Sequence, residues 1–180
     1  MRRIVKRLYY YFMLVASFVS RAFRNRNVTM SLAICAYKSQ GVSFTGMPRY
    51  IHPNAYLDAS GGLYIGERVV ISTRVIVLTH DYSINVGIAQ ISDSLNKDTG
   101  LLSSVNIGDW SFLGAGCIIL PGTTIGKYCV IGAGAVVKGD IPDYSIVVGN
   151  PAKIIKTTDR WKESLCRSTK NNIRFFQDEI

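Results

Sequence analysis

An aliphatic residue recurs every six positions through the middle of this 180-residue chain, and in its clearest run a small or short side chain lies four residues after each of the first five. In the clearest run the aliphatic residues are Ile107, Leu113, Ile119, Ile125, Ile131 and Val137, and the small ones are Ser111, Cys117, Thr123, Cys129 and Ala135. An α-helix has about 3.6 residues per turn, so it cannot place residues six apart on one face. The period therefore predicts short extended segments joined by corners and stacked into a coil with the aliphatic side chains inside.

The same period starts earlier in the chain and is interrupted twice. Its earlier aliphatic positions are Ile51, Leu57, Ile65, Ile71 and Val77. The step from Leu57 to Ile65 is eight residues, so we expect Ser60-Gly61-Gly62 to absorb two extra residues in a bulge or a wider corner. Residues 81–104 contain no hexad and the repeat resumes at Val105, which predicts a loop that leaves the coil and returns in register. Such insertions in repeat proteins commonly lie on the binding face.

The first 27 residues predict a basic amphipathic helix. An apolar run of twelve residues, from Leu8 to Val19, is flanked by seven Lys and Arg residues. A membrane-spanning helix needs about 20 apolar residues, so this run is too short to cross a bilayer. It suits the surface of an anionic membrane, with Leu8, Phe12, Val15 and Val19 turned toward the lipid. Packing on the rest of the protein would use the same side chains, and both interpretations remain open.

The chain is thus expected to be mainly β, with helical appendages at both ends. Residues 1–49 form a basic helical segment and a lead-in, of which residues 28–49 predict either a second helix or an irregular first coil. Residues 50–156 form the repeat domain with its excursion loop at 81–104. Residues 157–180 carry a sparse apolar stripe and predict a helix that caps the open end of the coil.

Charge and cysteine content narrow the function classes. The net charge is +9, but residues 1–57 hold nine Lys and Arg and no acid, whereas residues 58–180 hold twelve of each sign. The repeat domain therefore carries no net positive charge, which argues against a nucleic-acid-binding face on it. The four cysteines lack metal-site spacing, and Cys117 and Cys129 occupy the small-residue column as packing residues. Free thiols and the lack of a signal-cleavage pattern favour the cytoplasm.

The stretch IGDWSFLGAGCIILPGTTIGKYCVIGAGAVVKGDIPDYSIVVGNPAKIIK resembles the hexapeptide-repeat acyltransferases, in particular the maltose, galactoside and exopolysaccharide O-acetyltransferases. The resemblance covers roughly residues 51–156, and the ending GNPAKIIK is its most specific part. It implies a left-handed parallel β-helix, a homotrimer, acetyl-CoA as acetyl donor and active sites between neighbouring subunits. It implies no metal requirement.

His80 is the candidate catalytic residue. It ends a hexad run at the mouth of the 81–104 loop, where the resembling enzymes carry their catalytic histidine. Acetyl transfer to a hydroxyl needs a base, and imidazole has a suitable pKa. The chain's other histidine, His52, precedes a proline and is assigned to a corner.

Three residues are candidates for binding the acceptor. Asp58, twenty-two residues before His80, matches an acceptor-binding aspartate of the resembling enzymes, although an aspartate that caps its own turn fits equally well. Asp81 and Asn85 lie at the start of the excursion loop. Neighbours on an extended chain face opposite ways, so Asp81 is not assigned as the orienting partner of His80.

The resemblance also implies a set of donor-binding residues. They are Phe112, Gly114, Ala115, Ala133, Lys138, Lys153 and Lys156. Phe112 stands where the family commonly has tryptophan, and Trp110 is two positions earlier. Small residues let the pantetheine arm approach the backbone, and the lysines would meet the phosphates of CoA. Lys138 is displaced by one position from the family's lysine, and each of these lysines could instead be a solvated surface residue.

These features predict an acetyl-CoA-dependent O-acetyltransferase acting on a saccharide hydroxyl in capsule, O-antigen or exopolysaccharide synthesis. An N-acetyltransferase acting on an amino sugar nucleotide and a non-catalytic β-helix scaffold remain alternatives. A serine O-acetyltransferase is not expected, because such enzymes carry a long helical N-terminal domain. A metal-dependent carbonic anhydrase would need three histidine ligands per site, and the whole chain has two histidines.

Overall fold

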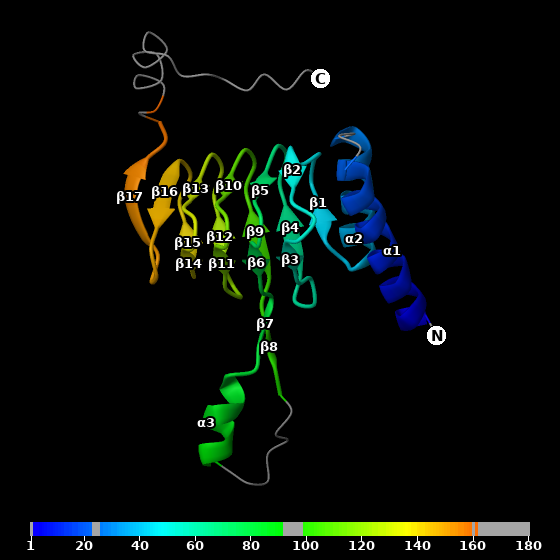
Figure 1. Cartoon of the computed structure of the whole chain (residues 1–180). Coiled ribbons are helices and arrows are strands. Elements are labelled where there is room, and N and C mark those ends of the chain that lie inside the picture. Colours follow the sequence, from blue (N-terminus) through cyan, green and yellow to red (C-terminus); the bar gives the residue numbers. More distant parts are fainter. Residues whose placement is uncertain (1, 23–25, 92–98, 160, 162–180) are drawn as a thin grey trace.

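The computed structural model describes residues 2–22, 26–91, 99–159 and 161, and shows a parallel β-helix with two helices at its N-terminal end (Figure 1). Three sheets, whose strands are parallel except for β17 (Lys153–Thr157), form the sides of the coil. The first contains β1 (Ser43–Phe44), β4 (Leu63–Ile65), β9 (Val105–Ile107), β12 (Thr124–Ile125) and β15 (Asp140–Ile141). The second contains β2 (Tyr50–Ile51), β5 (Val70–Ile71), β10 (Phe112–Leu113), β13 (Val130–Ile131), β16 (Ser145–Val148) and β17. The third contains β3 (Tyr56–Leu57), β6 (Ile76–Val77), β11 (Ile118–Ile119) and β14 (Val136–Val137).

The hexad columns run straight along the stack. On the second sheet Leu113 pairs with Ile71 on one side and Ile131 on the other, and every aliphatic residue expected inside the coil is buried. The small-residue column is buried too, and its polar members find partners there. The Ser111 hydroxyl donates to the Gly126 carbonyl (2.8 Å) and accepts from the Cys129 N–H (3.0 Å). The predicted mainly β, coiled architecture is therefore confirmed.

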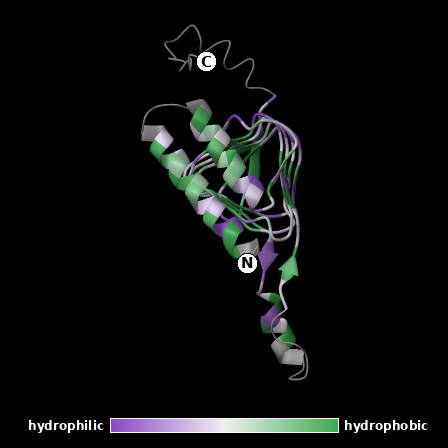
Figure 2. Cartoon of the chain, turned by 90° about the vertical axis from the view of Figure 1, so that its right-hand side faces the viewer, coloured by the Kyte–Doolittle hydropathy of each residue, from purple (hydrophilic) through white to green (hydrophobic). Residues whose placement is uncertain are grey.

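The two N-terminal helices cover the first coil. Helix α1 spans Arg2–Ala22 and α2 spans Arg26–Ser39, and both lie across the end of the β-helix (Figures 1 and 2). Apolar residues of α2 with helical spacing, Met30, Ala33, Ile34 and Tyr37, are buried against the coil. The Tyr37 hydroxyl donates to the Ala55 carbonyl (2.7 Å) and fixes the helix to its first turns. Of the two interpretations of residues 28–49, the second helix is correct for their first part.

The excursion leaves the coil as an antiparallel arm. Strand β7 (His80–Asp81) pairs with β8 (Leu101–Leu102), and helix α3 (Ile84–Ile91) lies beyond them, well away from the body (Figure 1). The sequence pattern predicted this excursion but did not identify helix α3 within it. Ile84, Ile88 and Ile91 have the spacing of one helix face, which was the available signal.

At the other end, β17 returns antiparallel along β16 and covers the last coil. Thr157, where the capping helix was expected to begin, ends this strand. The remainder of the expected helix falls mainly on residues 160 and 162–180, which lie outside the described residues. Among the helices that the structure describes, none has the length and hydropathy to cross a membrane.

Candidate active site

His80 lies where the chain leaves the third sheet of the coil to form the arm. Its Nδ1 is 2.7 Å from Asp58 Oδ2 and 3.2 Å from the Ser60 hydroxyl. The Asp58 side chain is 10% exposed, whereas that of His80 is 33% exposed. The histidine therefore rests on a shielded carboxylate while part of its ring remains open to solvent.

The Asp58 carboxylate is held by several donors besides His80. Its Oδ1 accepts the Ser60 N–H (3.0 Å), and its Oδ2 accepts the Thr79 N–H (2.9 Å) and the Thr79 hydroxyl (2.6 Å). Burial alone would raise the pKa of Asp58, but the hydrogen bonds from Thr79, Ser60 and His80 outweigh it and hold the pKa well below its ordinary value. Asp58 is therefore a carboxylate at neutral pH.

This charge sets the tautomer of His80. A carboxylate can only accept a hydrogen bond, so Nδ1 carries the proton and its N–H donates a hydrogen bond to Asp58. The other ring nitrogen, Nε2, then keeps its lone pair. Orientation of a histidine by a hydrogen-bonded carboxylate is the arrangement that general bases commonly use. The sequence left open whether Asp58 binds the acceptor substrate or caps its own turn. In the structure Asp58 contacts His80 directly, and its two oxygens accept hydrogen bonds from Ser60 and Thr79 of this corner.

The wide corner between β3 and β4 makes this geometry possible. Asp58 begins a turn in which Ser60 N–H bonds back to the carboxylate, and the Gly61 N–H donates to the Thr79 hydroxyl (2.9 Å). A Cβ at Gly61 would overlap the Thr79 carbonyl oxygen and crowd the Ser103 N–H. The two extra residues that the sequence placed here are therefore part of the support of His80.

The other acceptor candidates stabilise the arm. Asp81 Oδ1 accepts the Ser83 N–H (2.8 Å), and hydrogen bonds from Ser83 lower the pKa of Asp81, with smaller contributions from Lys138 and His80. Asn85 Oδ1 accepts the Thr99 N–H (3.2 Å) and so ties the two sides of the excursion together. The ring of Tyr82 meets His80 edge-on at 5.6 Å between centroids, a contact that the sequence reasoning missed.

His52 has the corner role expected of it. Its Nδ1 accepts the Asn54 N–H (3.2 Å), as in a turn that holds its own backbone. Within the part of the chain that the structure describes, no three metal-ligating side chains gather into a group.

The donor candidates are divided between two parts of the coil. Lys138 follows β14, whose Val137 is aligned with Ile119 and, one coil further, with Val77. It therefore lies on the same corner as His80. Phe112 and Lys153 lie on the second sheet, as does Lys156. Gly114, Ala115 and Ala133 lie at the end of that sheet, on the next corner. One chain therefore does not gather all seven residues around His80.

The corner of Ala115 and Ala133 is open to solvent. Both alanines are exposed, and a Cβ at the adjacent Gly116 or Gly134 would meet no atom within 4 Å. The corner thus presents open backbone with little side chain in the way. Part of this backbone is already paired within the coil, because the Gly114 N–H donates to the Ile131 carbonyl (2.8 Å) and the Gly134 N–H donates to the Ala115 carbonyl (2.9 Å).

Comparison with known proteins agrees with the repeat and the fold. Residues 97–139 match the family described as bacterial transferase hexapeptide (six repeats). The repeat region of this chain is thus similar to the hexapeptide-repeat transferases. A probable acetyltransferase of Mycobacterium tuberculosis is 39% identical over 62% of this chain and 35% of its own length. The putative lipopolysaccharide biosynthesis O-acetyl transferase WbbJ of Escherichia coli K12 is 32% identical over 65% of this chain and 61% of its own length.

Solved hexapeptide-repeat structures share the architecture. The maltose O-acetyltransferase of Clostridium difficile 630 is 25% identical, with a TM-score of 0.56 over 86% of this chain and 87% of its own. A mutant of AntD, an N-acyltransferase of Bacillus cereus in complex with dTDP and coenzyme A, is 26% identical, with a TM-score of 0.50 over 66% of this chain and 65% of its own. The chain spans between about a third and three fifths of the two curated relatives named above.

Proposed function

We propose that this hexapeptide-repeat protein is an acetyl-CoA-dependent O-acetyltransferase that acts on a saccharide hydroxyl. The observation that carries the proposal is the hydrogen bond between Asp58 and His80 Nδ1, which leaves Nε2 as a base at the mouth of the arm. Similarity to WbbJ and to a maltose O-acetyltransferase supports oxygen as the acceptor atom and a saccharide as the acceptor class. Capsule, O-antigen or exopolysaccharide synthesis is the corresponding role.

In this mechanism acetyl-CoA supplies an acetyl group held as a thioester. His80 Nε2 removes the proton of the acceptor hydroxyl as its oxygen attacks the acetyl carbonyl carbon. The negative charge of Asp58 stabilises the imidazolium that results. As the carbon–sulfur bond breaks, the imidazolium returns that proton to the departing thiolate, so His80 ends the cycle neutral.

Direct transfer fits the state of the two coil cysteines. Cys117 and Cys129 are buried in the small-residue column. Burial raises the pKa of the Cys117 thiol to about 12 and also raises that of Cys129. A protonated, buried thiol is a poor nucleophile. Neither cysteine is therefore assigned a covalent intermediate.

The divided donor residues support a site shared between subunits. We assign the open corner of Ala115 and Ala133 to the pantetheine arm, and Lys153 and Lys156 to the phosphates. These residues would lie near His80 of a neighbouring subunit if the Ala115 and Ala133 corner of one subunit packed against the corner of the next subunit from which the arm leaves. A homotrimer, as the family resemblance implies, would provide three such shared sites.

An N-acyltransferase acting on a nucleotide-linked amino sugar is the second candidate. Its support is the likeness to AntD, which was solved with dTDP and coenzyme A. The same base would remove the proton that the neutral amine loses as its nitrogen attacks the acyl carbonyl carbon. His80 and Asp58 therefore do not distinguish the two acceptors.

A product assay distinguishes them. The purified full chain is incubated with acetyl-CoA and one acceptor at a time, either a neutral saccharide or a nucleotide-linked amino sugar. Thiol release and product mass are followed in each reaction. An added acetyl group that hydroxylamine removes is an ester and supports O-transfer, whereas a resistant one is an amide and replaces the first proposal with the second. Thiol release no faster than that of His80→Ala with every acceptor would favour the scaffold.

A further inference from the structure

Helix α1 presents a band of large apolar side chains that the described chain does not cover. Its members are between 52% and 67% exposed and are Ile4, Leu8, Tyr11, Phe12, Val15, Phe18 and Val19. The opposite face of α1, which includes Tyr10, Leu14 and Ser17, is turned toward α2 and the core. The band faces outward at the end of the β-helix, where Figure 2 shows α1 nearest the viewer and largely hydrophobic. An exposed apolar surface of this extent marks an interaction site.

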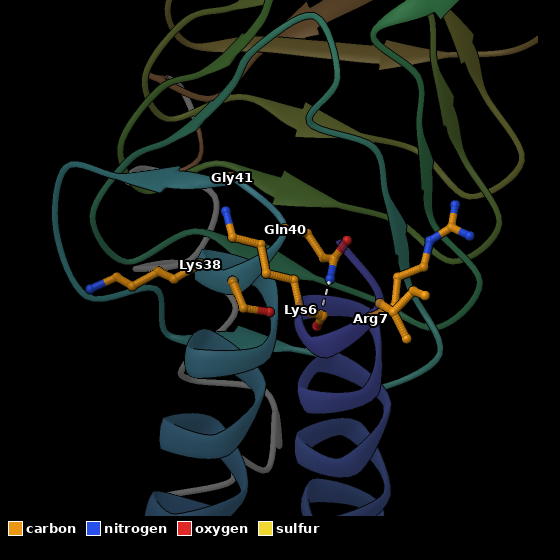
Figure 3. A pocket seen from close by; sticks show the side chains of 7 residues that line it. Lys6, Arg7, Lys38, Gln40 and Gly41 are labelled. Atoms are coloured by element: carbon orange, nitrogen blue, oxygen red, sulfur yellow. Dashed lines mark hydrogen bonds between the residues drawn. The ribbon is translucent and has the colours of Figure 1, made fainter. Parts of the chain in front are cut away.

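A cationic pocket adjoins this band. It encloses about 430 Å³ between the start of α1 and the end of α2, and Ile4, Lys6, Arg7 and Lys38 contribute to its lining. The charged ends of Lys6, Arg7 and Lys38 lie on different sides of it, and the Gln40 side-chain amide donates to the Lys6 carbonyl (3.4 Å) across it (Figure 3). Ile4 belongs to both the pocket and the band, so the two surfaces are continuous.

The positive charge of the pocket has no nearby carboxylate along the chain, because the first acidic residue is Asp58. The carbonyl groups at the end of α2 are already occupied. Those of Tyr37 and Lys38 accept the N–H groups of Gln40 and Gly41, each at 3.0 Å. The residual negative end of the helix dipole amounts to about half a charge. Three cations outweigh it, so the pocket favours an anion.

A phosphate beside an apolar surface is the chemistry of a phospholipid. We propose that α1 lies in the surface of an anionic phospholipid membrane, with one lipid phosphate in the pocket of Lys6, Arg7 and Lys38 and the acyl chains against the apolar band. Such helices bury their apolar face to a depth of about 5–10 Å without crossing the bilayer. A second copy of the chain fits this end less well, because each copy would bring basic residues and no acid from its first 57 residues. The band is also wider than the two-position seam of a coiled coil.

Vesicle co-sedimentation of the full chain tests this membrane site. Vesicles of phosphatidylcholine with phosphatidylglycerol are compared with vesicles of phosphatidylcholine alone, at low and high salt. Each basic side chain near an anionic surface adds about a factor of five in affinity, so Lys6→Gln with Lys38→Gln should weaken binding by about 30-fold. The matched control, Arg74→Gln with Lys127→Gln, removes the same charge from exposed corners of the β-helix and should change binding by less than about two-fold.

A second pair of variants tests the apolar band. Phe12→Ser with Val15→Ser alters two residues that are more than 60% exposed, so the fold should persist, as circular dichroism and the oligomeric state will show. Loss of sedimentation in this variant supports the proposal.

Equal sedimentation with both vesicle types, or equal binding by the Lys6/Lys38 variant and the Arg74/Lys127 control, overturns the phosphate site. If the full chain stays in solution with every vesicle, or if Phe12→Ser with Val15→Ser loses only self-association, the band is an interface between copies of this chain. Inorganic phosphate that binds the free chain as tightly as vesicles do would point to a soluble anion instead.

Discussion

The Asp58 carboxylate lies 2.7 Å from His80 Nδ1, although the two residues are separated by a full turn of the coil. Strand β3 brings Asp58 to this corner and β6 brings Thr79 and His80, so the contact depends on the pairing of Leu57 with Val77. Thr79 donates to the carboxylate through both its N–H and its hydroxyl. The coil thus provides a rigid frame for His80, the proposed base.

Replacing His80, the proposed base, should greatly slow catalysis and leave the fold intact. We predict that His80→Ala lowers kcat by about 10² to 10⁴, the usual contribution of a positioned general base. Acetyl-CoA binding should persist, because the donor candidates lie mostly on other parts of the coil. Steady-state kinetics and a binding titration measure the two effects. The control is His52→Ala, whose histidine holds a different corner of the coil, and a His80→Ala enzyme as fast as this control would rule out His80 as the base.

Replacing the carboxylate tests the orientation of that base. Asp58→Asn keeps the shape but offers His80 an amide that can donate to Nδ1, so the opposite tautomer is stabilised and Nε2 loses its lone pair. We predict a fall in kcat of about 10² to 10⁴. Steady-state kinetics measure this fall, and an Asp58→Asn enzyme as fast as wild type would show that Asp58 does not orient His80.

Asp58 should also contribute to the pH dependence of stability. Its pKa is lower in the folded chain than in the unfolded one, so its stabilisation is complete above the ordinary carboxyl pKa of 3.8 and is lost as the pH falls below that value. The Tm of the wild-type chain should therefore drop more steeply than that of Asp58→Asn between about pH 4 and pH 2. Thermal melts across this range measure both slopes. Parallel slopes would mean that the hydrogen bonds to Asp58 do not favour its charged form.

The sequence was informative about the coil because each hexad makes the same contacts as the next. Ile107, Leu113 and Ile119 are interchangeable members of one repeating column, so the period alone indicates which side chains are inside. His80 could be chosen because it ends such a run. Helix α3 was missed because it is a single short segment without a repeating neighbour, and only the spacing of Ile84, Ile88 and Ile91 indicated it.

The contact between Asp58 and His80 was also missed at the level of sequence, although the signal was present. One coil is three hexads, and the eight-residue step adds two residues, so Leu57 lies beside Val77 and Asp58 beside the residue that follows it. The position of the carboxylate was thus available from the register. The direction of the two side chains was not, because it depends on the turn of Ser60 and Gly61 and on the hydrogen bonds of Thr79.

Gly61 should be intolerant of any side chain. A Cβ there would overlap the Thr79 carbonyl oxygen, and backbone atoms cannot move aside as a flexible side chain can. We predict that Gly61→Ala lowers kcat by displacing Thr79 and the neighbouring His80. Gly87→Ala in α3 is the matched control, since a Cβ there meets nothing within 4 Å. Kinetics of the two variants should differ by more than about tenfold, the scale of a small misplacement at an active site. Equal rates would show that the corner is more adaptable than its geometry indicates.

The small-residue column should reject a large side chain. Ala135 is fully buried between neighbouring coils, and its N–H donates to the Gly132 carbonyl (3.3 Å). Leucine would add methylene groups to a packed interior, so Ala135→Leu should lower the free energy of unfolding by about 1 to 3 kcal/mol or prevent folding. Lys127→Leu is the control, because that side chain is 57% exposed and its ion pair with Asp109 lies at the surface. This change should stay within about 0.5 kcal/mol. Denaturant unfolding of both variants gives the comparison, and an Ala135→Leu chain as stable as wild type would contradict a tightly packed hexad interior.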